Sequence, residues 1–180
     1  MIDEHAVHCI RAYALHRRSN LATSNFAPSE IRMLTAEEIV RVRTSFDMVF
    51  ANANDTMTAF YDRIFELAPE IRPMFPADLS VLKQDFISKL AMLVGSLDPT
   101  TGLLGGADIL GRNHQKYGAK AEHYPMVGEA LLWSLARGLG PHWTDELEQA
   151  WRKVYGVVAQ RMVDVGNAPP APSAGPSQRM

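Results

Sequence analysis

Apolar side chains recur at helical spacing through most of this chain, and this pattern limits its fold more than any other feature. Between Thr35 and Val165, apolar residues return every three or four positions, as they do on one face of a helix. One such face carries Leu82, Phe86, Leu90, Leu93 and Leu97. No stretch alternates apolar and polar residues as a half-buried strand does, and no repeat of fixed period occurs. The sequence therefore predicts an all-α domain over residues 35–165.

Local signals indicate where the helices begin and end. The residues Thr35 to Glu38 form a capping box at the start of the first helix. Pro69 opens a short turn of helix that closes near Phe75, while Gly118 is placed to end a helix as a C-terminal glycine does. Further helices are predicted over residues 55–67, 79–97 and 144–165, and another begins at Pro125 and is broken by Gly140-Pro141. This gives about six long helices and one short one.

The two ends of the chain differ in composition from this body. Residues 1–34 mix charged and polar residues, and they are predicted to be a weakly ordered or helical extension. Within them, residues 6–17 are compatible with a helix that places Val7, Ile10 and Ala14 on one face. Residues 166–180 are rich in Pro, Ala, Ser and Gly, and we expect a disordered tail there.

Composition excludes several classes of protein. The net charge of −2 gives no basic field for nucleic acid. The single cysteine, Cys9, rules out an internal disulfide framework and any cage that needs several cysteines. No apolar run reaches the roughly 18–20 residues of a membrane span, and the first residues hold no apolar signal core. We therefore expect a cytoplasmic protein that binds neither nucleic acid nor membranes.

His114 is the residue with the clearest chemical meaning. It lies in the segment LGRNHQKYG, four residues after Leu110 and three before Tyr117, so all three are predicted to share one helical face. The polar neighbours of His114 fall on other faces. A neutral imidazole in apolar surroundings is a good ligand for iron or another transition metal. The segment alone also fits a core histidine that is hydrogen-bonded to a backbone carbonyl.

Four segments, taken in order, resemble globins. They are FYDRIFELAPEIRPMF (60–75), LGRNHQKYG (110–118), HYPMVGEALL (123–132) and AWRKVYGVVAQ (150–160). The sequence is most similar to single-domain bacterial globins related to the haem domain of flavohaemoglobins, and more distantly to neuroglobins. The resemblance covers residues 35–165. It implies the globin fold, a three-on-three helical sandwich around haem b.

The resemblance also implies roles for single residues. His114 corresponds to the proximal histidine that holds the haem iron, and Tyr61 to the distal tyrosine whose hydroxyl donates to a bound gas molecule. No other catalytic residue is implied besides the haem iron and Tyr61. The remaining haem contacts implied are Phe75, Leu90, Tyr124, Val127, Leu131 and Tyr155.

The sequence departs from the globin pattern on both sides of the expected haem. Counted from Phe75, the distal position that usually carries Gln or His falls on Leu82, and the next turn falls on Phe86. This predicts a nearly apolar distal side and a five-coordinate iron. Alternative sixth ligands are Lys83 and the extension residues His5, His8, Cys9 and His16.

On the proximal side, the position of the flavohaemoglobin glutamate falls on Gly166. Asp164 is offset from it by two residues, or about 200° around a helix, so the glutamate's role is not transferred to Asp164. This weakens the case for electron donation from the proximal histidine to the iron, which supports peroxidase-like chemistry.

The function that this resemblance implies is reversible binding of dioxygen and NO, with CO and cyanide as further ligands. It would serve oxygen binding or storage, or NO detoxification as an NO dioxygenase. The chain shows no flavin or nicotinamide domain, so such turnover needs an external electron donor. We expect a monomer or weak homodimer. The alternatives are a haem-based gas or redox sensor, or interaction module, that signals through its terminal extensions, and a haem-free bundle with a structural His114.

Overall fold

The computed structural model describes residues 34–97 and 104–167, and every regular element within these ranges is a helix. The α-helices are α2 (Ala36–Phe50), α3 (Ala53–Leu67), α4 (Ser80–Gly95), α5 (Leu104–Lys116), α6 (His123–Leu139) and α7 (Asp145–Asn167), with short 3-10 helices η2 (Pro69–Met74) and η3 (Gly140–His142). The prediction of an all-α protein is confirmed. The predictions for residues 1–33 and 168–180 lie outside the described residues.

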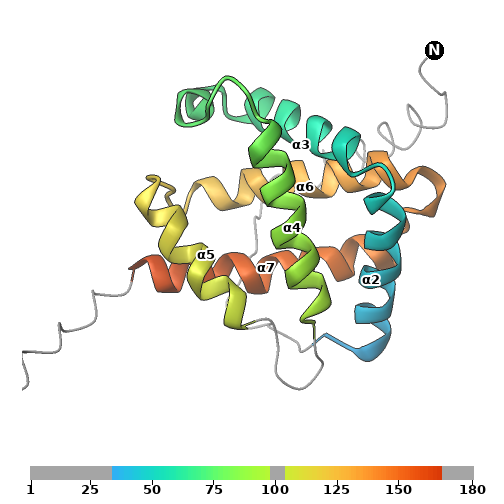
Figure 1. Ribbon diagram of the computed structural model, residues 1–180. Coiled ribbons are helices and arrows are strands. Elements are labelled where there is room, and N and C mark those ends of the chain that lie inside the picture. Colours follow the sequence, from blue (N-terminus) through green and yellow to red (C-terminus); the bar gives the residue numbers. More distant parts are fainter. Residues whose placement is uncertain (1–33, 98–103, 168–180) are drawn as a thin grey trace, which may run out of the picture.

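The helices pack in pairs that cross one another. Helix α3 packs along α6, and α5 packs against α7, while α2 contacts α7, α4 and α6 (Figure 1). Helix α4 crosses in front of α6 and α7 in this view. In the part of the chain that the structure describes, no helix is both long and apolar enough to cross a membrane.

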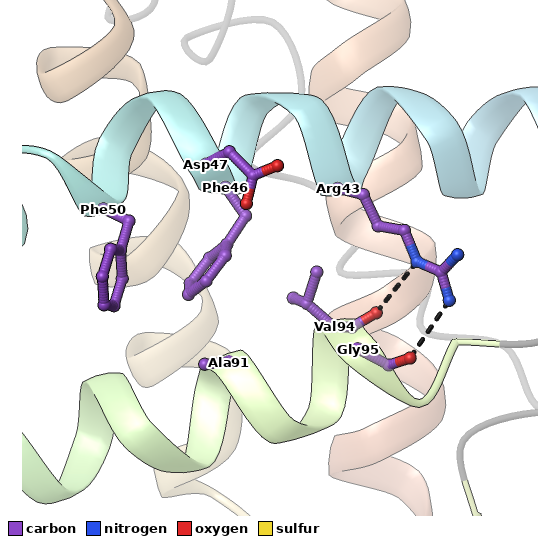
Figure 2. A pocket seen from close by; sticks show the side chains of 7 residues that line it. All are labelled: Arg43, Phe46, Asp47, Phe50, Ala91, Val94 and Gly95. Atoms are coloured by element: carbon purple, nitrogen blue, oxygen red, sulfur yellow. Dashed lines mark hydrogen bonds between the residues drawn. The ribbon is translucent and has the colours of Figure 1, made fainter.

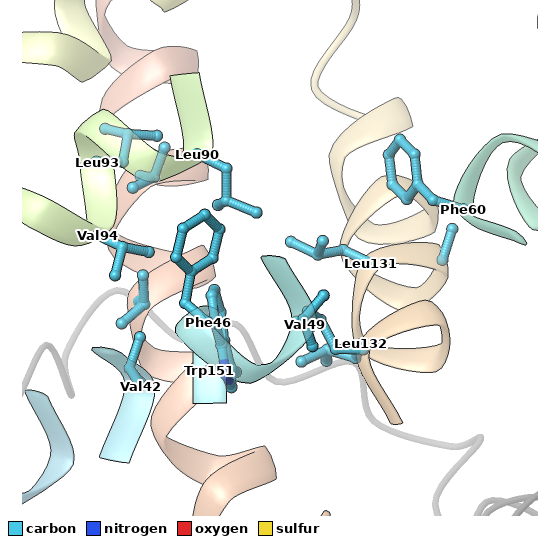
Figure 3. Packing of buried hydrophobic residues seen from close by; sticks show 14 of the residues in the cluster. Val42, Phe46, Val49, Phe60, Leu90, Leu93, Val94, Leu131, Leu132 and Trp151 are labelled. Carbon is cyan, nitrogen blue, oxygen red and sulfur yellow. The ribbon is translucent and has the colours of Figure 1, made fainter. Parts of the chain in front are cut away.

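The core lies where α2, α4, α6 and α7 meet. Phe46 of α2 lies near Leu90 of α4 and Leu131 of α6 (Figure 3), and all three are buried. Trp151 of α7 is 1% exposed, and its indole N–H donates a 3.0 Å hydrogen bond to the Ser45 hydroxyl. Ser45 in turn donates to the Val42 carbonyl. The polar atoms of this layer are therefore satisfied, as buried polar groups must be.

Most of the predicted helical signals are confirmed. The Thr35 hydroxyl accepts from the Glu38 backbone N–H at 3.2 Å, and the Glu38 carboxylate accepts from the Thr35 N–H at 2.9 Å. Gly118 has a φ of +81°, and the Ala119 N–H donates to the His114 carbonyl at 3.0 Å. This is the geometry of a glycine-terminated helix, in which only glycine takes a positive φ without strain. The apolar residues that recur at helical spacing in α2 and α7 are buried, as that spacing predicts.

Three local predictions are wrong. Tyr117 does not share the inner face of α5, because it follows the last helical residue and is 78% exposed. The glycine-rich residues 102–106 are predicted by their composition to precede this helix, yet α5 begins at Leu104. Helix α7 continues to Asn167, so Gly166 lies in its last turn and not at the edge of a tail. Each error concerns a helix end, where periodicity carries little information.

Two glycines allow helices to approach closely near the predicted site. A Cβ at Gly111 of α5 would lie 2.8 Å from the carbonyl oxygen and 2.9 Å from the Cα of Met162 in α7. A Cβ at Gly128 of α6 would overlap the ring of Tyr155. The obstacle at Gly111 is backbone, which cannot rotate away as a side chain can. The position of α5 on α7 therefore depends on residue 111 being a glycine, which has no side chain.

We expect Gly111→Ala to lower the free energy of unfolding by about 1–3 kcal/mol, the usual cost of overpacking. The added methyl must push α5 away from α7 at Met162. Urea denaturation followed by circular dichroism measures this change. Gly95→Ala is the control, because a Cβ there meets nothing within 4 Å, and its stability should be unchanged or slightly higher. Equal effects of the two substitutions would contradict this account of the helix crossing.

Candidate functional site

His114 lies in the last turn of α5, with its ring oriented by the turn before it. Its Nδ1 is 2.8 Å from the carbonyl oxygen of Leu110. Because a carbonyl only accepts hydrogen bonds, Nδ1 carries the proton and donates it. The lone pair is therefore on Nε2, and no described residue forms a hydrogen bond with that atom. A hydrogen bond of this kind fixes the tautomer and orientation of a metal-binding histidine.

The surroundings of His114 favour the neutral ring. Burial lowers its pKa, the Leu110 carbonyl acts in the opposite direction, and the positive charge of Lys89 lowers it further. The residue as a whole is exposed, yet enough protein surrounds its ring for desolvation to be the main cause. A neutral imidazole keeps its lone pair available near pH 7, which metal binding requires.

Tyr61 lies on α3 among aromatic rings and is only 4% exposed. Its ring centroid is 5.1 Å from that of Phe60, 6.0 Å from Phe75 and 6.2 Å from Phe65. Burial, with a contribution from the charge of Asp85, raises the pKa of Tyr61 to about 12. The hydroxyl is therefore protonated at neutral pH. It forms no hydrogen bond with any described residue, although a buried tyrosine usually finds a partner.

The structure brings two further predicted residues to the Tyr61 side. Phe75 follows η2, and its carbonyl accepts a 3.0 Å hydrogen bond from the Arg72 guanidinium. Phe86 of α4 packs at 4.7 Å on Phe60, the neighbour of Tyr61. Leu82, one turn before Phe86, is half-buried, as are Phe75 and Phe86 themselves. Each of these three side chains keeps part of its apolar surface accessible, and the Phe75 ring lies next to that of Tyr61.

Polar groups of α4 are engaged elsewhere. The ammonium group of Lys83, considered above as a sixth iron ligand, donates to the Thr58 hydroxyl at 2.8 Å. Asp85 and Lys89 form an ion pair at 2.8 Å, one turn apart. The other alternative ligands, His5, His8, Cys9 and His16, lie outside the described residues.

The remaining predicted contacts come from α4, α6 and α7. The Tyr155 hydroxyl donates to the Tyr124 carbonyl at 2.6 Å, which ties α7 to the start of α6, and burial raises the pKa of Tyr155. Tyr124 and Val127 are half-buried, and burial also raises the pKa of the Tyr124 phenol. Leu90 and Leu131 are buried in the core beside Phe46 (Figure 3). Tyr155 therefore fixes the position of Tyr124 through its backbone.

Neither Gly166 nor Asp164, the two positions considered for the glutamate of the last helix, forms a hydrogen bond with His114. The carbonyl of Gly166 accepts a hydrogen bond from the side-chain amide of Gln115, the neighbour of His114. Asp164 is exposed and accepts a 2.8 Å hydrogen bond from Gln160. The acceptor on His114 is therefore a neutral backbone carbonyl and not a carboxylate.

Sequence reasoning missed two residues that shape the site. Phe65 packs on both Phe75, at 5.4 Å, and Tyr61, and its position one turn after Tyr61 could have indicated this. The charge of Lys89 on α4 contributes to the lowered pKa of His114 on α5, and no sequence signal would have shown that.

These features together fit a large apolar group held by one imidazole. The described residues contain no cluster of three or more His, Cys, Asp or Glu side chains that could hold a metal ion. Among the described residues, a metal at His114 would therefore lack a full set of protein ligands. The accessible apolar surface of Phe75, Leu82, Phe86 and Val127 suits a planar apolar group.

Comparisons with known proteins agree with this interpretation. The globin family profile matches residues 45–162. A flavohemoprotein of Bacillus subtilis (strain 168) is 26% identical over 136 residues, covering 74% of this chain and 34% of that protein. Neuroglobin of Tetraodon nigroviridis is 32% identical over 143 residues, covering 72% of this chain and 90% of that protein. This chain thus spans about a third of the flavohemoprotein and most of the neuroglobin.

A solved structure shows the same architecture. The bacterial globin from Campylobacter jejuni superposes with a TM-score of 0.58 at 26% identity, covering 73% of this chain and 96% of that one. The fold defines the class as an all-α protein, and the described site has the apolar surface and the single imidazole that would suit a prosthetic group. The chain belongs to the globin family, as the family profile shows. The globin fold and haem as cofactor, both predicted above, are confirmed.

The lowered pKa of His114 predicts how stability depends on pH in the haem-free protein. Below about pH 6.5 the histidine of the unfolded chain takes up a proton that native His114 resists. The unfolded state then binds more protons, so the free energy of unfolding falls as the pH falls through this window. His114→Gln should lose less stability than the wild type between pH 7 and pH 5. Urea denaturation at several pH values measures this difference.

His142→Gln is the matched control for this experiment, because it removes an exposed histidine on η3. It should follow the wild-type curve. A His114→Gln curve parallel to the wild type would show that burial does not oppose protonation of His114.

Proposed function

We propose that this globin binds dioxygen and NO reversibly at a five-coordinate haem iron, with His114 as the proximal ligand. The observation that supports this most strongly is the hydrogen bond from His114 Nδ1 to the Leu110 carbonyl, which leaves Nε2 with its lone pair. A histidine oriented in this way is pre-organised to hold a metal through the other nitrogen. Haem supplies the iron that binds gas molecules, and the protein supplies orientation and surroundings.

Each residue of the site has a role in this proposal. His114 would hold the iron, and Phe75, Tyr124 and Val127 would supply apolar contacts to the porphyrin. Leu82 and Phe86 exclude water from the distal side, because apolar side chains offer it no hydrogen-bond partner. Leu90, Leu131 and Tyr155 support these contacts from the core. Their burial and half-burial agree with this division.

Tyr61 is the proposed distal donor. Its raised pKa keeps the hydroxyl protonated, and the hydroxyl has no competing partner among the described residues. A donor that is already buried and oriented loses little by hydrogen bonding to a bound gas molecule. The surrounding rings of Phe60, Phe65 and Phe75 hold Tyr61 in place.

The proximal geometry favours reversible binding over oxidative chemistry. The acceptor on His114 is a neutral carbonyl, which raises the basicity of the ring less than a carboxylate does. NO detoxification therefore stands second in this proposal, and its turnover needs electrons from a separate donor protein. The predicted cytoplasmic location is part of the same proposal, because such donors and dioxygen are both available there.

We expect His114→Gly to lose haem during gel filtration, with the Soret absorbance falling at least about tenfold. The substitution removes the only proposed bond between protein and iron, and imidazole added to the buffer should restore binding in the space that remains. His142→Gly, which removes an exposed histidine, should retain haem as the wild type does. A His114→Gly protein that retains haem with an unchanged spectrum would overturn the assignment.

Tyr61→Phe should speed the release of dioxygen by roughly ten- to a hundredfold. One hydrogen bond to a charged or partly charged acceptor contributes about 1.5–3 kcal/mol, which corresponds to that change in rate. Stopped-flow displacement of dioxygen by CO measures the rate. Tyr117→Phe removes the hydroxyl of a tyrosine that is 78% exposed and should have no effect. An unchanged rate in Tyr61→Phe would show that Tyr61 does not donate to the ligand.

A further inference from the structure

A groove of about 510 Å³ lies between α2 and α4, outside the site described above. Figure 2 shows the side chains that line it, which are Arg43, Phe46, Asp47, Phe50, Ala91, Val94 and Gly95. Phe50 is 55% exposed, whereas Phe46 is 8% exposed and forms the floor. An aromatic ring that is exposed beside a concave apolar surface indicates a place where another apolar side chain can pack.

The charged residues of the groove indicate the charge of its occupant. The Arg43 guanidinium donates to the carbonyls of Gly95, at 3.1 Å, and Leu97, at 2.7 Å, so it caps the end of α4. Asp47 is exposed, and no described residue forms an ion pair with it. The groove therefore offers apolar surface, a guanidinium whose N–H groups are directed to backbone carbonyls, and one exposed carboxylate that pairs with no described residue. An amphipathic segment whose apolar face is flanked by a single cation, placed to meet Asp47, matches these properties.

Residues 6–17 of this chain have the matching composition. Their sequence, AVHCIRAYALHR, contains no acidic residue and places Val7, Ile10 and Ala14 on one helical face. Arg11 lies one turn after Val7 and flanks this face. These residues lie outside the part of the chain that the structure describes, so the argument for them rests on the sequence pattern alone.

The connection between this segment and the groove has a suitable length. Helix α2 forms one wall of the groove, and its far end at Phe50 lies about 21 Å along the helix from Ala36. Sixteen residues, 18–33, join the segment to the described chain. A flexible connection of that length spans roughly 20–24 Å on average. It would present the segment at an effective concentration near the millimolar range, which favours it over a second copy of the chain.

We propose that residues 6–17 form an amphipathic helix that binds in the groove between α2 and α4 of the same chain. Val7, Ile10 and Ala14 pack on Phe46 and Phe50, and Arg11 pairs with Asp47. Phe46 also lies near Leu90 in the core (Figure 3). The bound segment is therefore one layer of side chains away from the haem site.

Photo-crosslinking in the full-length chain tests this proposal directly. A benzoylphenylalanine is incorporated in place of Ile10, and crosslinked peptides are identified by mass spectrometry after irradiation. Crosslinks within one chain to residues 43–50 or 91–95 are the expected result. Crosslinks between two chains would show that the segment of a second copy occupies the groove. Crosslinks to other residues, or no crosslinks, would show that the segment does not bind there. Each of these results would overturn the proposal.

Two matched variants control for loss of folding. Phe50→Asn removes the exposed ring of the groove and should reduce the yield of crosslinks about tenfold, because it removes at least ~1.4 kcal/mol of apolar contact. Val81→Asn changes a residue of α4 that is 72% exposed and does not line the groove, so the yield should not change. Equal yields from these two variants would contradict the proposal.

A charge exchange tests the proposed ion pair. Asp47→Lys should reduce crosslinking, and Asp47→Lys combined with Arg11→Glu should restore it. A general loss of structure would not be restored by the second substitution, so failure to recover would overturn the Arg11–Asp47 pair. The crosslinking measurement requires no haem. If it contradicted the proposed docking of residues 6–17, the proposed function would not be affected.

Discussion

The close approach of α5 to α7 at Gly111 determines where His114 lies. With no side chain at Gly111, the two helices approach until a Cβ there would be 2.8 Å from the Met162 carbonyl. Leu110, the adjacent residue, is thereby buried at the same crossing, and its carbonyl accepts the proton of His114 Nδ1 one turn later. Gly118 then ends the helix soon after His114. Contacts between two helix backbones thus orient the imidazole.

Burial has opposite consequences for proton affinity on the two sides of the site, and both suit the proposed function. It lowers the pKa of His114, which keeps a lone pair on the imidazole, and it raises the pKa of Tyr61 to about 12, which keeps a proton on the phenol. Each group is disfavoured in its charged form for the same reason, namely loss of solvation. Loss of solvation thus favours the protonation state that the proposed function requires of each residue.

The sequence predicted those features that depend on residues close together in the chain. The inner faces of α2 and α7 follow from spacing, and the capping box at Thr35 and the terminating Gly118 follow from local backbone chemistry. Four short segments in order were enough to indicate the globin family. Their agreement in spacing carried more information than any one motif did.

Features that depend on packing between helices were not predictable in this way. Nothing in the sequence shows that Lys83 bonds Thr58 on α3, or that the Tyr61 hydroxyl lacks a partner among the described residues. Tyr117 was misplaced because α5 ends just before it, and the helix end is set by the turn at Gly118. The groove between α2 and α4 likewise arises only when these two helices are packed together.

The central claim is that a neutral His114, hydrogen-bonded to a backbone carbonyl, is the iron ligand of this globin. Resonance Raman spectroscopy of the ferrous, ligand-free protein tests it most directly, because the iron–histidine stretching band reports both the bond and the charge of the ring. The account predicts this band at the frequency of a neutral imidazole, with a shift when the histidines are labelled with ¹⁵N. Absence of the band, or a band at the higher frequency of an imidazolate, would contradict it.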